Sequence, residues 1–319
     1  MKKVLIFGCG GFVGYYLSKE LSINGYEVYG TDINESSLDI YSYIHSFIKG
    51  DLLDNDFVLN LIDSIKPNYI VNLAAISSVG NSWKIPQLTI DVNVKGTLNV
   101  LESVRKLGLS SKILLVGSSE EYAVSNNMIG EEYPIIANNP YGISKVTQER
   151  FALIYRNEYH MNIINTRTFN HTGIGQPLTF AIPSFVKQAA TIHNSGKPGI
   201  MRVGNLNAYR DIGDVRDMVS AYRLILEKDT KETVFNVGSG SKYLLKDIVN
   251  YIISLSQQKI TIHVDPNMLR PLDNPIIWCD NSKIKKELGW EPRYSVFTAI
   301  DLMFEKFVSQ KERNGSCNN

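Results

Sequence analysis

Residues 3–14 read KVLIFGCGGFVG, a short apolar run followed at once by a turn rich in glycine. Three of the glycines, Gly8, Gly11 and Gly14, have G-x-x-G-x-x-G spacing. Because glycine has no side chain, the backbone can turn tightly there, and a pyrophosphate can approach the amide groups at the positive end of the following helix. The stretch therefore predicts a β-strand, a phosphate-binding turn and a helix, which is how a dinucleotide-binding fold begins.

Short β-branched runs alternate with longer segments of helical period as far as residue 168. This alternation predicts βαβ units around a parallel sheet that is covered on both faces. The predicted strands are Lys3–Phe7, Glu27–Thr31, Ser46–Lys49, Tyr69–Leu73, Lys112–Val116 and Asn162–Arg167. The predicted helices are Phe12–Asn24, Asp54–Ile65, Pro86–Leu107 and Pro140–Tyr159. We therefore expect an α/β fold, with a Rossmann-type doubly wound parallel sheet formed by residues 1–168.

The predicted elements become shorter beyond this point. We expect a smaller α/β substrate lobe over residues 169–309, some of whose elements could return to the first sheet. Its predicted elements are the helices Ala181–His193, Val215–Glu227, Leu244–Ser256 and Ser295–Val308 and the strands Val234–Val237 and Lys259–Val264. Residues 310–319 are polar and are expected to form a flexible tail.

The composition excludes several classes of protein. With 33 Lys and Arg against 32 Asp and Glu in 319 residues, the chain has no basic field for nucleic acid. Its cysteines, Cys9, Cys279 and Cys317, are odd in number and far apart, which fits neither a disulfide framework nor a metal cluster. No apolar run approaches the roughly 18 residues of a membrane span. We therefore expect a cytoplasmic protein without a metal site or a membrane partner.

Asp32 ends the second predicted strand, about twenty residues beyond the glycine turn. A carboxylate at this place can accept hydrogen bonds from a ribose diol and repels a 2′-phosphate. It favours NAD(H) as cofactor, with NADP(H) possible. The alternative is that Asp32 only caps the segment that follows it.

Tyr141 and Lys145 lie four residues apart at the start of the predicted helix Pro140–Tyr159, and hence on one face of it. A phenol with a pKa of about 10 carries protons poorly at neutral pH, but a nearby cation favours the phenolate. Ser118 ends the fifth predicted strand, at the sheet edge where ligands bind in such folds. By itself this spacing also occurs on solvated helix faces. Its position in the fold predicts a general acid/base site.

With Asn72-Leu73-Ala74-Ala75, these motifs resemble the extended short-chain dehydrogenase/reductase family of nucleotide-sugar enzymes over most of the chain. The resemblance implies that Tyr141 is the general acid/base, Lys145 the ribose anchor and tyrosine tuner, and Ser118 the partner of the reacting oxygen. Asp51 would contact the adenine edge, its alternative being a helix cap. The implied cofactor contacts are Gly8, Gly11, Phe12, Val13, Gly14, Asp32, Asp51, Leu52, Leu73, Ala74, Ala75, Tyr141 and Lys145.

The same resemblance implies a nucleotide-sugar substrate. Asn170 would contact the sugar or its phosphate, and Lys187 would border the base. Arg210 and Arg270 would pair with the diphosphate, because a guanidinium can bind phosphate oxygens in two places. For either arginine alone, a surface ion pair is the alternative.

Within the family, the later segments are most similar to reductases of GDP-4-keto-6-deoxy-D-mannose. The nearest alternative is a GDP-mannose 4,6-dehydratase, because Glu120 stands where dehydratases keep the base that removes a C5 proton. Another nucleotide-sugar dehydratase or epimerase, or a regulatory protein that only binds NAD(P), would also keep the Rossmann lobe. A regulator would have little use for the complete Ser118, Tyr141 and Lys145 set.

The helices predicted at Pro86–Leu107 and Pro140–Tyr159 carry more apolar residues than one sheet face can cover. These residues are Val92, Leu98, Leu101, Phe151, Ile154 and Tyr155. Paired across a two-fold axis, the helices would form a four-helix interface. We therefore expect a homodimer or a dimer of dimers, in agreement with the resemblance.

Overall fold

The computed structural model describes residues 1–36, 38–269 and 274–315. Its main sheet has seven parallel strands in the order β11-β6-β5-β4-β1-β2-β3. Their bounds are β1 Lys3–Phe7, β2 Glu27–Asp32, β3 Ser46–Lys49, β4 Tyr69–Asn72, β5 Lys112–Ser118, β6 Ile163–Thr168 and β11 Val234–Val237. The direction of winding reverses between β1 and β4, and ligands bind at the carboxyl ends of the strands at such a point. The predicted doubly wound α/β fold is confirmed.

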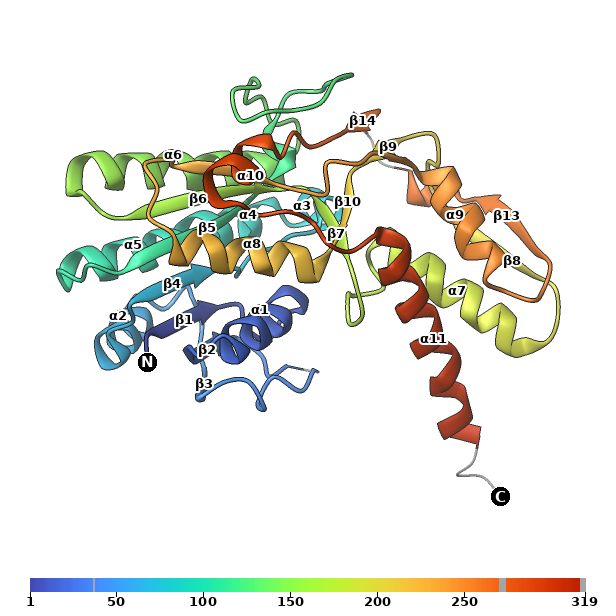
Figure 1. Cartoon of the computed structure of the whole chain (residues 1–319), viewed down its shortest axis with the longest axis horizontal. Helices are drawn as coiled ribbons and strands as arrows, with labels where there is room; N and C mark the ends of the chain where they lie inside the picture. The colour runs from blue at the N-terminus through green and yellow to red at the C-terminus, as the bar shows by residue number, and fades with distance from the viewer. Residues whose placement is uncertain (37, 270–273, 316–319) are drawn as a thin grey trace.

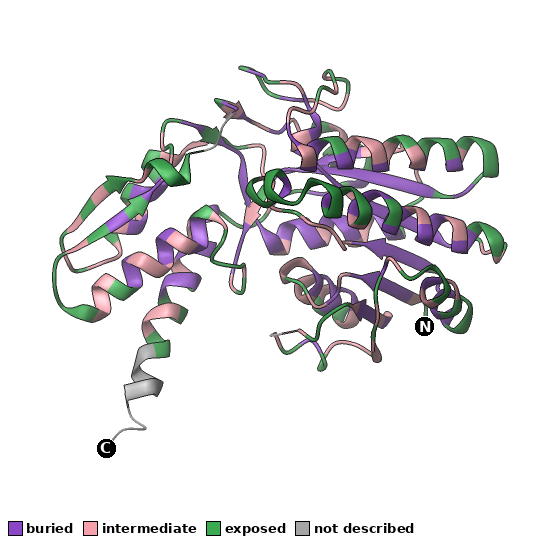
Figure 2. Ribbon diagram, turned by 180° about the vertical axis from the view of Figure 1, so that it is seen from behind, coloured by how far each residue is buried: buried purple, intermediate pink, exposed green. Residues whose placement is uncertain are grey.

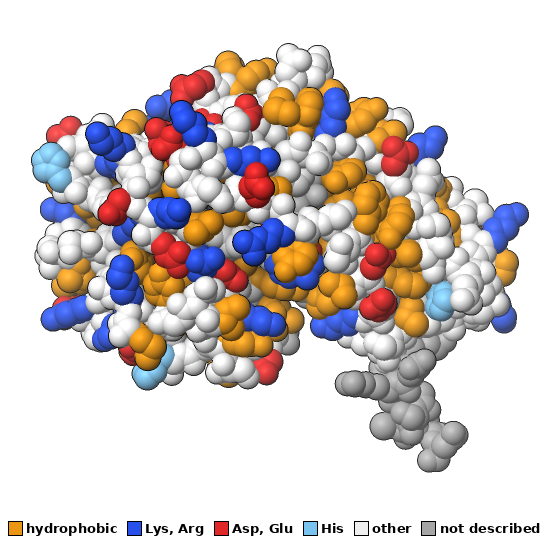
Figure 3. All heavy atoms as spheres, viewed as in Figure 1, with side chains coloured by type: hydrophobic (Ala, Val, Ile, Leu, Met, Phe, Trp, Pro, Cys, Tyr) orange, Lys and Arg blue, Asp and Glu red, His pale blue; other side chains and the backbone are white. Residues whose placement is uncertain are grey.

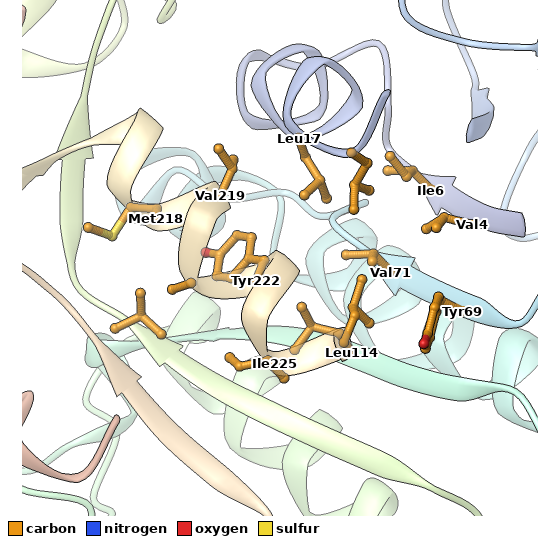
Figure 4. Packing of buried hydrophobic residues seen from close by; sticks show 14 of the residues in the cluster. Val4, Ile6, Leu17, Tyr69, Val71, Leu114, Met218, Val219, Tyr222 and Ile225 are labelled. Atoms are coloured by element: carbon orange, nitrogen blue, oxygen red, sulfur yellow. The ribbon is translucent and has the colours of Figure 1, made fainter. Parts of the chain in front are cut away.

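Helices cover both faces of the sheet (Figure 1). They are α1 (Phe12–Ile23) and α8 (Val215–Glu227) on one face, and α2 (Asn55–Ile65), α5 (Gly96–Lys106) and α6 (Pro140–Tyr159) on the other. Because successive strand residues point to opposite faces, Val4 and Ile6 pack toward α1 and α8, while Leu5 packs toward α2 and α5. Figure 4 shows the first of these cores, with Leu17 and Tyr222 over the sheet.

The helix predicted over Pro86–Leu107 is confirmed as an unbroken helical run from Pro86 to Lys106, but one of its turns is π-helical. α3 (Val79–Lys84) and α4 (Pro86–Ile90) are followed by a π-helical turn at Asp91–Lys95 and only then by α5. The wider π turn carries the buried side chain of Asn93, which bonds the backbone N–H and C=O of Ile76 and the hydroxyl of Ser144. Contacts remote in the sequence therefore accompany a widened turn within the helix, which the pattern of apolar residues did not predict.

A smaller lobe lies beyond the carboxyl ends of β5 and β6 (Figures 1 and 2). It consists of α7 (Ala181–Ser195), β8 (Gly199–Val203), α9 (Leu245–Ser254), β13 (Ile260–Val264) and α11 (Val296–Gly315). β8 pairs in parallel with β13, and α11 packs along α7. The buried faces of these elements form a core of their own around Phe185, Met201 and Ile252.

Part of the second half returns to the main sheet. β11 pairs with β6, α8 packs against α1, and α10 (Ser282–Leu288) lies against β11. The strand predicted at Val234–Val237 therefore belongs to the Rossmann sheet and not to the smaller lobe. The remaining short strands are β7 Asn170–Thr172, β9 Tyr209–Arg210, β10 Ile212–Asp214, β12 Tyr243–Leu244 and β14 Ile276–Ile277.

The last helix is longer than predicted. α11 runs to Gly315, through part of the segment expected to be a flexible tail, because the Gln, Lys, Glu and Arg residues at 310–313 are good helix formers. The rest of that segment, 316–319, lies outside the described residues. Among the helices described, none is both long and apolar enough to span a membrane.

Candidate active site

The glycine turn lies between β1 and α1. Gly8 has a φ of +81°, and a Cβ there would lie 2.6 Å from the backbone nitrogen of Ala74. A Cβ on Gly14 would lie 2.4 Å from the carbonyl oxygen of Cys9, so both positions require glycine. α1 begins at Phe12 and Val13, and its N-cap, Gly11, provides no side-chain cap. The start of α1 is thus free of capping side chains, which fits the predicted pyrophosphate site.

Asp32 holds this turn in place. One carboxylate oxygen accepts the N–H of Gly10 at 3.1 Å, and the other accepts the N–H of Asn34 at 3.3 Å. The second bond is a local turn and not a helix cap, because residues 33–36 are not helical. Ser36 adds a hydrogen bond from its hydroxyl to the carbonyl of Gly10 at 2.9 Å. Gly10 and Ser36 were not predicted as site residues, and the spacing of the other glycines gave no signal for them.

The other predicted cofactor residues follow β3 and β4. Leu73, Ala74 and Ala75 come directly after β4, where Ala74 touches the glycine turn. Asp51 is exposed and accepts the N–H of Leu53 at 2.9 Å, while Leu52 is buried. The alternative that Asp51 caps a helix is wrong, because the N-cap of α2 is Asp54.

Ser118 and Tyr141 meet at the carboxyl edge of the sheet. Ser118 ends β5, Tyr141 lies in the first turn of α6, and the buried hydroxyl of Ser118 acts on the phenol and by itself lowers its pKa. Tyr141 is only 8% exposed, and this burial, with Glu121 and Glu120 nearby, raises the pKa of its phenol. Tyr141 therefore holds its proton at neutral pH, as a proton donor must.

Lys145 lies one turn further along α6 and is buried. Its ammonium donates to the carbonyl oxygen of Val116 at 2.8 Å and to the amide oxygen of Gln148 at 3.0 Å. Burial lowers the pKa of Lys145 to about 8, and the charge of Glu121 opposes this shift. The pKa of Tyr141 is raised mainly by its burial, and the main effect that opposes this rise comes from Ser118.

Polar residues beneath this pair were missed in the sequence. Ser82 accepts the backbone N–H of Tyr141 at 3.2 Å, and Asn93 donates to the hydroxyl of Ser144 at 2.8 Å. Thr97 contacts Gln148, so polar residues spaced four apart on α6 face the π-helical turn and α5. Polar residues four positions apart on both helical segments could have indicated a buried hydrogen-bond network, although not which residues bond to each other.

Two neighbouring glutamates differ in their surroundings. Glu121 is fully buried, and one of its oxygens accepts the N–H of Ser118 at 2.7 Å. Burial and the charge of Glu149 raise the pKa of Glu121. Glu120, the base of the dehydratase alternative, accepts a hydrogen bond from the side chain of Asn139 at 2.9 Å.

The predicted substrate residues lie on the side of the smaller lobe. Asn170 is exposed in β7, and the Lys187 ammonium of α7 lies over the ring of Phe307. Arg210 is buried in β9, where it donates to the carbonyls of Tyr209 and Asn274 at 2.8 and 2.7 Å. Arg270 lies outside the described residues.

Two surface hollows occur elsewhere. One of about 300 Å³ lies between α1, α8 and residues 289–294, and one of about 490 Å³ between α1 and α11. Ser118, Tyr141 and Lys145 line neither of them. On the face seen in Figure 3, basic and acidic side chains are interspersed and no patch of one sign stands out. The candidate site is therefore identified by its side chains and hydrogen bonds, and not by a cavity.

Comparison with known proteins agrees with the resemblance that the sequence motifs indicated. The model of a family described as GDP-mannose 4,6 dehydratase matches residues 5–303. A GDP-mannose 4,6-dehydratase of Yersinia enterocolitica is 30% identical, over 93% of this chain and 91% of the relative. A GDP-6-deoxy-D-mannose reductase of Pseudomonas aeruginosa is 26% identical, over 97% and 98%.

Solved structures share the fold over 97% of the chain. RMD from Pseudomonas aeruginosa, complexed with NADPH, has a TM-score of 0.84 at 24% identity, covering 97% of this chain and 100% of its own. A UDP-glucose 4-epimerase from Thermotoga maritima with UDP-glucose has a TM-score of 0.85 at 24% identity, covering 97% and 99%. The main sheet and both lobes therefore have counterparts in proteins of known structure.

Proposed function

Because the chain belongs to the GDP-mannose 4,6-dehydratase family of extended short-chain dehydrogenase/reductase enzymes, we propose that it reduces the C4 keto group of a nucleotide-linked 4-keto-6-deoxy sugar. The proposed substrate is GDP-4-keto-6-deoxy-D-mannose or a related GDP-4-keto sugar, since the relatives are named for GDP-linked sugars. The observation that carries the proposal is the burial of Ser118, Tyr141 and Lys145 together where β5 ends and α6 begins. A protein that only binds a cofactor has no need of it.

Each residue of the site has a separate role in the proposed reaction. Tyr141 holds a proton that it can give to the carbonyl oxygen of the sugar, and the hydroxyl of Ser118 can stabilise negative charge that develops there. Lys145 anchors the cofactor ribose. The turn at Gly8 and Gly14, where a Cβ would fill the space, and the uncapped start of α1 fit a dinucleotide. A nicotinamide cofactor supplies the hydride when bound.

We propose NAD(H) as the favoured cofactor, with NADP(H) accepted. The carboxylate of Asp32 lies beside the glycine turn, where it can pair with a ribose diol and disfavour a 2′-phosphate. Acceptance of the phosphorylated cofactor is supported by the NADPH complex of the Pseudomonas aeruginosa RMD.

A second candidate is dehydration of GDP-mannose, favoured by Glu120 beside Ser118 and by the names of many relatives. Stoichiometry separates the two. A reductase consumes one external NAD(P)H per sugar, whereas a dehydratase recycles its bound cofactor with no net change.

The test is to incubate the purified protein with GDP-4-keto-6-deoxy-D-mannose and NADH or NADPH, and separately with GDP-mannose alone, following reduced nicotinamide absorbance and the sugar products. We expect loss of the absorbance with the keto sugar only. Conversion of GDP-mannose without net cofactor change, stopped by Glu120→Gln, would replace our proposal with dehydration.

We also propose a homodimer formed through α5 and α6. Leu101 and Tyr155, predicted for the interface, are buried within the chain and are unavailable to a partner. Ile154 is 49% exposed and Ile143 48%, and both lie on the same side of α6.

Both described cysteines are free, which supports a reducing, cytoplasmic compartment.

A further inference from the structure

The side chain of Asn139 makes three hydrogen bonds at the start of α6. Its carbonyl oxygen accepts the N–H of Gly142 at 2.9 Å, which caps the helix. Its amide group donates to a carboxylate oxygen of Glu120 at 2.9 Å and to the amide oxygen of Asn138 at 3.1 Å. Asn139 is only 4% exposed, so solvent cannot easily replace these partners.

Capping alone does not require asparagine at this position. Asparagine, aspartate and serine are about equally good N-caps, because each offers an oxygen acceptor. Only asparagine combines that acceptor with an amide donor at this length. The donor side of Asn139, which faces Glu120, therefore has a role separate from the cap.

Glu120 lies close to the reacting groups. Its backbone N–H donates to the hydroxyl of Ser118 at 3.2 Å. Its carboxylate raises the pKa of Tyr141, as do the carboxylate of Glu121, on the same 3-10 helix (Ser119–Glu121), and the phenol of Tyr222 on α8. Lys145 is the cation on the neighbouring turn of α6 and interacts with Glu121. The place of the Glu120 carboxylate therefore affects how firmly Tyr141 holds its proton.

We propose that Asn139 is a positioning residue, which fixes the Glu120 carboxylate beside the Ser118–Tyr141 pair with the same side chain that caps the helix carrying Tyr141. The inference rests on the proposed role of Tyr141 as proton donor. Loss of the donor side removes this hydrogen bond from the carboxylate and changes the proton transfer, even when the helix cap is kept.

Asparagine side chains extend this arrangement toward the predicted phosphate arginine. The amide of Asn138 donates to the side-chain oxygen of Asn274 at 3.2 Å, and Arg210 donates to the backbone carbonyl of Asn274 at 2.7 Å. Asn274 and Arg210 are both buried. Hydrogen bonds through Asn139, Asn138 and Asn274 thus connect the start of the helix that carries Tyr141 with the strand that carries Arg210.

The decisive variants keep the cap and change the donor. Asn139→Asp keeps the acceptor for Gly142 but turns a second carboxylate toward Glu120. We expect kcat to fall about tenfold with KM changed less than about threefold, because the added negative charge disfavours the phenolate and makes Tyr141 a poorer proton donor. Asn139→Ser also keeps an acceptor but adds no charge. It is expected to lower kcat less than Asn139→Asp does.

A double variant tests the pairing directly. In Asn139→Asp with Glu120→Gln, the glutamine amide can donate to the aspartate, so donor and acceptor are exchanged. We expect kcat to rise above that of Asn139→Asp, with KM still changed less than about threefold. An Asn139→Asp enzyme with the wild-type kcat would overturn the proposal.

Thermal unfolding separates failure of this proposal from failure of the proposed reaction. Facing carboxylates raise the pKa of one of them in the folded state, so the melting temperature of Asn139→Asp should fall between pH 5 and pH 8 more than that of wild type. Adding Glu120→Gln should remove the excess. If no keto reduction occurs but this coupling does, only the reaction is wrong; absence of the coupling overturns the positioning role.

Discussion

The carboxyl group of Glu121 accepts the backbone N–H of Ser118 at 2.7 Å, while its second oxygen is buried without a hydrogen-bond partner among the described atoms. Burial and the nearby charge of Glu149 raise the pKa of Glu121, and Arg167 and Lys145 oppose them in part. A buried acid that holds the backbone of the candidate catalytic serine therefore favours its protonated form.

The first prediction concerns stability and pH. The pKa of Glu121 is higher in the folded than in the unfolded chain, so its stabilising contribution is fully present below the unfolded pKa and is lost as pH rises through the folded one. Glu121→Gln mimics the protonated acid and should lose less stability between pH 5 and pH 8, by on the order of 1 kcal/mol. Denaturant unfolding at several pH values measures this. Equal pH dependence in both proteins would contradict it.

The second prediction concerns the proton donor. Tyr141→Phe removes the phenolic proton and little volume, so kcat should fall by about 10²–10⁴ while cofactor affinity stays close to wild type. Tyr159→Phe, near the exposed end of the same helix, is the matched control and should keep the wild-type rate. Lys145→Ala should weaken cofactor binding as well. Substantial turnover by the Tyr141 variant would remove Tyr141 from its role.

The third prediction concerns the choice of cofactor. Asp32→Asn removes the charge but keeps an oxygen that can accept the N–H of Gly10, so it should reduce the preference for NADH over NADPH by about tenfold, or roughly 1.4 kcal/mol. Asp32→Ala also loses the bond to the turn and should raise KM for both cofactors. Steady-state kinetics with each cofactor measures these effects. Unchanged ratios in both variants would exclude the proposed ribose contact.

The fourth prediction concerns assembly. Ile154→Asp places a charge on the exposed face of α6 and should convert the dimer into monomers in sedimentation velocity. Ile200→Asp, at an exposed position of β8 in the smaller lobe, is the control and should leave the dimer intact. A wild-type protein that stays monomeric at all concentrations would refute the dimer.

Patterns local in the sequence were sufficient for much of the fold. β1, β3 and α6 have the predicted bounds, because an apolar run bounded by a glycine turn or a proline specifies a strand or a helix start. Tyr141 and Lys145 could be placed on one helix face from their spacing, and near Ser118 from the position of that helix after the fifth strand. The glycine turn and Asp32 could be joined because both lie at ends of neighbouring parallel strands.

Features set by distant contacts could not be read in this way. The π turn depends on bonds from Asn93 to Ile76 and Ser144, which a pattern within one helix does not contain. The raised pKa of Tyr141 follows from burial by the whole fold. Cysteine counting and charge balance likewise gave no indication of the buried partners of Arg210.

The position of β11 affects how this protein is made. Synthesis proceeds from the N-terminus, so β6 leaves the ribosome well before Val234–Val237, the strand that pairs with its free edge. Until then the nascent chain presents an open strand edge, a template for wrong pairing and aggregation. Truncation before residue 234 would make that exposure permanent, and premature termination there should yield a chaperone client instead of a separate Rossmann domain.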